Sequence, residues 1–91
     1  MDYIKFPLSR LSVGATVVVE LRGVESDVFL VDDSNLHKLG RGDLSHLQGV
    51  GGHYKQSPIR LQVPSSGAWT AVVIPIGGRV EASVTVHPAL A

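Results

Sequence analysis

The sequence predicts an all-β fold: a single-domain antiparallel β-sandwich, jelly-roll-like or a flattened barrel, of about six to eight short strands with one long central loop. Apolar and polar residues alternate with a period of two in several segments, and glycine- or proline-containing turns separate those segments. No window combines the apolar spacing of a helix with helix caps over a useful length. The length of 91 residues fits one β-sandwich domain over residues 1–91.

The first half of the chain carries three of the predicted strands. Residues 3–8 alternate, and Pro7 predicts an edge strand, because proline cannot donate a ladder hydrogen bond. Residues 15–22 alternate clearly between turn glycines at positions 14 and 23. Residues 26–32 are apolar on both faces, which is typical of a central strand that is covered on both sides.

The second half carries three more. Residues 57–63 alternate after Pro58 at the start of the strand. Residues 68–76 are the most apolar stretch, and we expect Trp69 to be buried there. Gly77-Gly78 predicts a two-residue turn that joins this stretch to residues 79–87 as a hairpin. The opposite faces of the alternating strands carry Thr16, Val18, Glu20, Arg22, Arg60, Gln62, Glu81, Ser83, Thr85 and His87.

Residues 33–57 show no convincing strand pattern, apart from one short helical turn expected within residues 36–47 after Asp33 or Ser34 as cap. A connection longer than about 12–15 residues is uncommon in a compact domain and is often functional. The segment is basic, whereas residues 20–33 are acidic. We therefore expect this central loop to be the recognition surface.

Composition excludes several classes of protein. Eight basic residues balance eight acidic ones, which argues against nucleic acid and membrane surfaces as partners. The absence of cysteine excludes disulfides and thiolate metal sites. The N-terminal residues resemble no signal peptide, and no apolar run approaches a membrane span. These observations predict a soluble, cytoplasmic protein without a cofactor.

Four motifs, in order along the chain, resemble a known family. They are Leu11–Val19, Asp27–Asn35, Gly51–Pro58 and Val63–Trp69. They resemble the opening Leu-x-x-Gly-x-x-Val-x-Val pattern, the Val-x-Leu-Met-Asp-x-x-Asn motif, the Gly-Gly…Ser-Pro element and the Val-Pro-x-x-Gly-x-Trp turn of a bacterial domain of unknown function, numbered eighteen eighty-three. The resemblance implies a small all-β module, in some relatives joined to TIR signalling domains, and hence a binding or sensing role. It implies no activity and no functional residue.

No motif for catalysis or metal binding is present, so we predict no enzyme and no metal site. His37, His46 and His53 could ligate zinc, but their spacing matches no known ligand pattern. Asp32, Asp33, Asn35 and Asp43 offer oxygen ligands for calcium, although hydrogen bonding within a turn explains them equally. The glycines at positions 49, 51 and 52 lack the spacing of a phosphate-binding loop and favour a flexible turn.

The sequence thus favours a non-catalytic binding module whose central loop contacts an unidentified protein or a small acidic ligand. The candidate binding residues are Asn35, Lys38, Arg41, His46, His53, Tyr54 and Lys55. One alternative is a structural module that self-associates as a homodimer, with the acidic and basic segments meeting across a twofold axis. Another is a metal-dependent hydrolase that uses the loop histidines.

Overall fold

The computed structural model describes residues 3–40 and 49–88, and in this part of the chain it contains seven strands and one short helix. In chain order these are β1 (Ile4–Leu11), β2 (Thr16–Gly23), β3 (Ser26–Asp32), α1 (Asp33–Gly40), β4 (Val50–Tyr54), β5 (Ile59–Gln62), β6 (Gly67–Pro75) and β7 (Val80–His87). No helix of the described ranges is long and apolar enough to cross a membrane.

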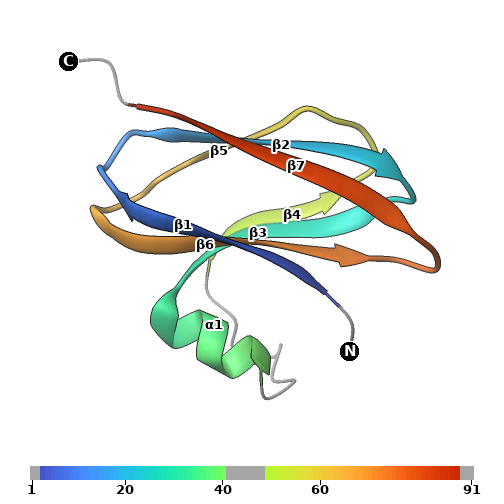
Figure 1. Ribbon diagram of the computed structural model, residues 1–91, viewed down its shortest axis with the longest axis horizontal. Coiled ribbons are helices and arrows are strands. Elements are labelled where there is room, and N and C mark those ends of the chain that lie inside the picture. Colours follow the sequence, from blue (N-terminus) through green and yellow to red (C-terminus); the bar gives the residue numbers. More distant parts are fainter. Residues whose placement is uncertain (1–2, 41–48, 89–91) are drawn as a thin grey trace.

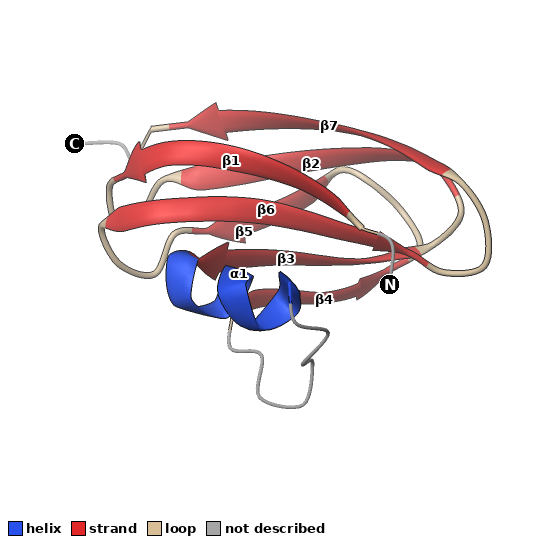
Figure 2. Ribbon diagram, turned by 60° about the horizontal axis from the view of Figure 1, so that its bottom comes forward, coloured by secondary structure: helices blue, strands red, loops and turns tan. Residues whose placement is uncertain are grey.

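The strands form two antiparallel sheets packed face to face (Figure 1). One sheet has four strands in the order β1-β6-β3-β4, and the other has three in the order β5-β2-β7. The predicted antiparallel sandwich is therefore confirmed. The sheets do not close into a barrel, because the edge strands β1 and β7 do not pair. These two edges lie on the same side of the molecule in both views (Figures 1 and 2).

Side-chain alternation places the core between the sheets. In β2, Val17 and Val19 are fully buried, and in β3 Val28 and Leu30 are too. The other face of β3 is also covered, as predicted, because Val31 packs with residues of β6 and with Leu36 of α1 (Figure 2). Trp69 is buried as expected, and its indole Nε1 donates a hydrogen bond to the Ser65 carbonyl at 2.9 Å.

The hairpin predicted at Gly77-Gly78 is wrong. Strand β6 pairs with β1 and β3, whereas β7 pairs with β2 in the other sheet. The turn adopts the expected positive φ at Gly77, 74°, but it carries the chain across the sandwich. Hydrogen bonds to the β2–β3 corner hold this crossing: Ile76 donates to the Glu25 carbonyl and Val24 donates to the Arg79 carbonyl, both at 3.1 Å.

The long central loop is also shorter than predicted. Residues 50–54 form β4, which pairs with β3 from Ser26↔Tyr54 to Leu30↔Val50. The flexible turn expected for the glycines is therefore wrong, since Gly51 and Gly52 lie inside a strand. The backbone of β3 passes so close to Gly51 that a Cβ there would overlap the carbonyl oxygen of Val28. Glycine at this position permits the close approach of the two strands.

The short helical turn predicted within residues 36–47 is an eight-residue helix that begins earlier, at Asp33. Its cap is Asp32 rather than the predicted Asp33 or Ser34. Asp32 Oδ1 accepts hydrogen bonds from the backbone N and the side-chain Nδ2 of Asn35, both at 2.9 Å. These bonds, with a smaller contribution from Lys38, lower the pKa of the Asp32 carboxyl below its usual value. This geometry confirms that Asp32 and Asn35 stabilise a turn through side-chain hydrogen bonds.

Candidate functional site

The predicted binding residues do not form one surface in the described part of the chain. Asn35 is buried at the start of α1, where it bonds Asp32, and Lys38 lies on the same helix. Tyr54 faces inward and packs against the core. Arg41 and His46 lie outside the described residues, as does Asp43 of the calcium hypothesis.

His53 and Lys55 lie next to acidic groups of the same chain. The antiparallel β3–β4 register sets Asp27 opposite His53. His53 Nδ1 is 2.8 Å from Asp27 Oδ1, and His53 Nε2 is 3.5 Å from Glu25 Oε2. Lys55 Nζ is 3.9 Å from the same Glu25 oxygen. Groups of the acidic and basic segments therefore meet within one chain. His53 and Lys55 are thus not free to pair with the acidic segment of a second copy across a twofold axis.

The two carboxylates favour the protonated imidazole. The hydrogen bond to Asp27 is the largest cause that raises the pKa of His53 above 6.5, with Glu25 adding to it. Both ring nitrogens already face an acid of the same chain, Nδ1 facing Asp27 and Nε2 facing Glu25. The described residues contain no group of three or more ligating side chains suited to a metal.

We expect His53 to make folding stability depend on pH. Its pKa is higher in the folded than in the unfolded chain, so its contribution is full below pH about 6.5 and disappears as the pH rises through the folded value. Urea unfolding of wild type and His53→Gln at about pH 5.5 and 8.5 measures this, since the two proteins should differ more at the lower pH. Asp27→Asn should lower the His53 pKa in an NMR titration. An equal difference at both pH values would contradict the ion-pair assignment.

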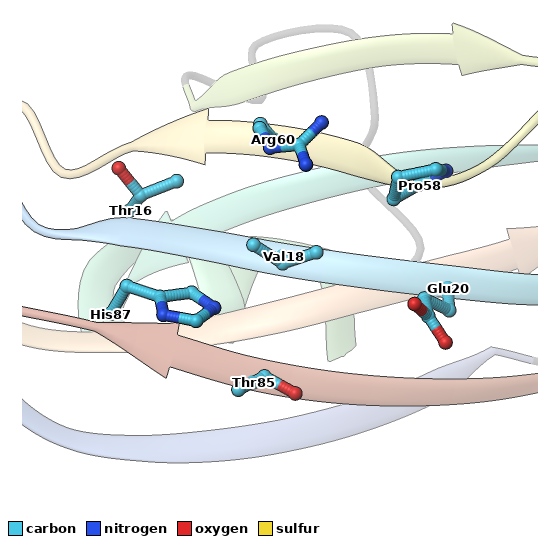
Figure 3. Close-up of a pocket in the computed structure, with 7 residues that line it drawn as sticks. All are labelled: Thr16, Val18, Glu20, Pro58, Arg60, Thr85 and His87. Carbon is cyan, nitrogen blue, oxygen red and sulfur yellow. The ribbon is translucent and has the colours of Figure 1, made fainter.

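Several polar side chains that form no hydrogen bond or ion pair with one another lie together on a different surface. The outer face of the three-stranded sheet is hollowed over β2, with a volume of about 500 Å³ (Figure 3). Val18 forms its floor, and the register sets Arg60 of β5 and Thr85 of β7 on either side. The lining residues are Thr16, Val18, Glu20, Pro58, Arg60, Thr85 and His87. We call this the β2 hollow.

Local strand geometry explains why these side chains converge. Successive side chains of a strand point to opposite faces, so Thr16, Val18 and Glu20 share the face opposite the buried Val17 and Val19. The outward residues of β5 and β7 follow the same rule. Glu20 and His87 lie at opposite ends of the β2 hollow in Figure 3, because His87 pairs with Thr16, four positions from Glu20. Four positions along a strand span about 13 Å.

Arg60 is the distinctive charge of the β2 hollow. It makes no ion pair with any residue in the described ranges. Val18 lies directly opposite it on β2, Thr16 and Glu20 lie at the two diagonal positions, and Thr85 lies beyond Val18 on β7. A guanidinium with nearby hydroxyl groups can bind a carboxylate or phosphate by charge-assisted hydrogen bonds. Alternation predicts that these residues face outward, but no local pattern marks them as a group, because only the strand order β5-β2-β7 brings them together.

Comparison with known proteins identifies the family. The model of the family described as Domain of unknown function (DUF1883) matches residues 1–89. The chain belongs to this family. No curated protein and no solved structure matches the chain significantly. The resemblance inferred from the four motifs is thus confirmed, and the described structure gives this DUF1883 domain an open sandwich of four and three strands.

Proposed function

We propose that this DUF1883 domain is a non-catalytic binding module that holds a small anion, a carboxylate or a phosphate, in the β2 hollow. The observation that carries the proposal is Arg60: a cation without an ionic partner in the described chain, set in a hollow whose other lining groups include two threonine hydroxyls and an imidazole. The volume of about 500 Å³ falls within the range of small-ligand sites.

Charge favours the β2 hollow over the segment suggested by the sequence. His53 and Lys55 already lie next to Glu25 and Asp27, so an incoming anion would have to displace an acid of the same chain. Arg60 forms no ion pair in the described chain, although Glu20, like Thr16, lies at a diagonal position on β2. An anion therefore gains a new ionic contact at Arg60 without breaking one.

The geometry supports binding rather than catalysis. An acid and a base that act on one substrate atom must both come within hydrogen-bond reach of it. Glu20 and His87 are the carboxylate and the imidazole of the β2 hollow, and about 13 Å of strand separates them. The hollow is also an open face of a sheet rather than a cleft that excludes water.

An amide-shift titration tests the proposal. Inorganic phosphate and succinate, added in turn at constant ionic strength to the ¹⁵N-labelled protein, should shift the amides of Thr16, Val18, Arg60, Thr85 and His87 in a saturable manner. Glucose, which is neutral, is the reference probe. Arg60→Gln should weaken the binding of either anion about tenfold or more, because it removes a charge-assisted contact.

Arg10→Gln is the matched control, since Arg10 is an exposed residue of β1 in the other sheet. It should leave binding unchanged. Equal losses in both variants would mean that the anion senses only overall charge, and the proposal would fail. Amide shifts concentrated at His53 and Lys55 would instead place the binding site in the segment predicted from the sequence, and the proposal would fail.

A further inference from the structure

The four sheet edges of the sandwich are not equally protected against pairing with another strand. Natural proteins blunt edges with proline, bulges, charge or short length. Strand β1 contains Pro7, and its register with β6 shifts between Leu8 and Arg10. Strands β4 and β5 have only five and four residues. Each of these three edges therefore carries at least one device that discourages another strand from adding to it.

Strand β7 has none of these devices except one charge. It has eight residues without proline, and it pairs with β2 without interruption from Gly23↔Val80 to Thr16↔His87. Glu81 is its one carboxylate, and it contains no lysine or arginine. Its other edge pairs with no strand of the described chain. A long, regular and nearly uncharged edge is a template for another strand.

The apolar side chains of β7 are also incompletely covered. Val80, Ala82, Val84 and Val86 point towards the core but remain half-buried, in contrast to the fully buried valines of β2. The inward residues of β1, the edge on the same side, are half-buried as well (Figure 2). This side of the sandwich therefore leaves a strip of apolar surface at the free edge of β7.

We propose that β7 pairs with β7 of a second copy of this chain, antiparallel about a twofold axis at Val84. This pairing would extend the three-stranded sheet into one of six strands. The sequence of β7 is complementary to itself in this register. Val84 meets Val84, Ala82 meets Val86, and Ser83 meets Thr85, so apolar groups oppose apolar groups on the inner face and hydroxyls oppose hydroxyls on the outer face.

The outer face supplies the hydrogen-bond complementarity that selects this register. With the axis at Val84, Glu81 of each copy lies opposite His87 of the other, so that the contact forms twice. An axis at Ser83 would instead place Glu81 opposite Thr85, and one at Thr85 would place it beyond the end of the strand. Within its own chain Glu81 lies opposite Arg22 of β2. Of these registers, only the one at Val84 adds an imidazole N–H on its free side, and hydrogen-bonded cross-strand pairs favour one register over its neighbours.

The absence of cysteine from the chain allows a direct test of strand and register. Directly opposed residues of antiparallel strands have Cα atoms about 4.5–5.5 Å apart, within the range of about 4.4–6.8 Å that a disulfide spans. Val84→Cys should therefore give a covalent dimer under mild oxidation. Ala82→Cys is the matched control, because the two copies of residue 82 would lie about 14 Å apart. Ala82→Cys should remain monomeric on a non-reducing gel.

Sedimentation velocity on the unmodified chain gives the second measurement. We expect a reversible dimer at concentrations up to hundreds of micromolar. Ser83→Lys, an exposed change outside the lining of the β2 hollow, should raise the dissociation constant about tenfold, because it places two lysines near the axis. Gln62→Lys adds the same charge to β5, the opposite edge of the same sheet, and should leave the dimer unchanged.

A wild-type chain that stays monomeric throughout this range overturns the proposal, and the β7 edge is then left for a strand of a different protein. Equal crosslinking of Val84→Cys and Ala82→Cys also overturns it, because the register would be wrong. The inference goes beyond the anion site and does not depend on it. Mass and crosslinking report on the dimer, whereas amide shifts with phosphate or succinate report on the β2 hollow, so that either can fail alone.

Discussion

Replacing Gly51 with alanine is expected to cost about 4 kcal/mol of unfolding free energy, a large fraction of the total for a domain of this size. The added Cβ would overlap the carbonyl oxygen of Val28 and lie 2.9 Å from the Cα of Phe29. Both are backbone atoms of β3, which cannot move aside as a flexible side chain could. The φ of 147° at Gly51 adds strain, because L side chains rarely adopt it.

Gly52→Ala is the matched control. It lies next along β4, its Cβ would meet no heavy atom within 4 Å, and its φ is not positive. It should change stability by less than about 1 kcal/mol, in the stabilising direction, because alanine reduces the entropy of the unfolded chain. Urea titrations followed by far-UV circular dichroism measure both variants. If both changes cost the same, the close β3–β4 contact described above would be wrong.

The same two glycines explain why β4 was not predicted from the sequence. Strands were predicted wherever a period of two was visible, and those in β2, β5 and β7 are present with the predicted faces. In β4, however, two glycines provide no side chain to reveal the alternation. This strand is held by its hydrogen bonds with β3, a long-range interaction that local pattern does not encode.

The pairing partner of each strand could not be predicted from the sequence pattern either. The pattern of β6 and β7 with two glycines between them is typical of a hairpin, and yet the strands belong to different sheets. The burial patterns separate a central strand from an edge strand. Strand β6 is buried on both faces over most of its length and is suited to the centre of the four-stranded sheet, whereas β7 alternates and forms an edge. Alternation does not decide the partner, since the alternating β1 pairs with β6 whereas the alternating β7 pairs with β2.

The candidate site depended on the same missing information. Alternation correctly turned Arg60, Thr85 and His87 outward, but their convergence over Val18 requires that β5 and β7 flank β2. Conversely, His53 and Lys55 looked like free basic groups until the β3–β4 register placed Asp27 and Glu25 beside them. In both cases strand order, rather than residue type, decides which charges are available to a ligand.

Replacing Leu30 with alanine is the second change with a large expected effect, about 3 kcal/mol of unfolding free energy. Leu30 is fully buried, and it lies opposite Ala71 of β6 and Val50 of β4 in the middle of the four-stranded sheet. Its side chain points into the space between the sheets, where both layers are fixed by their own hydrogen bonds. The surrounding strands can therefore collapse only partly around the lost atoms, and a cavity adds to the lost transfer free energy.

Val13→Ala is the control for Leu30→Ala, because the Val13 side chain is 57% exposed and its backbone N–H keeps its 3.0 Å hydrogen bond to Ser66 Oγ. It should alter stability by less than about 0.5 kcal/mol. The single tryptophan, buried in the core cluster that contains Leu30, reports unfolding in both variants. The dependence of free energy on urea should remain that of wild type, since neither change alters the surface exposed on unfolding by much. If Leu30→Ala cost as little as Val13→Ala, Leu30 could not lie between two rigid sheets.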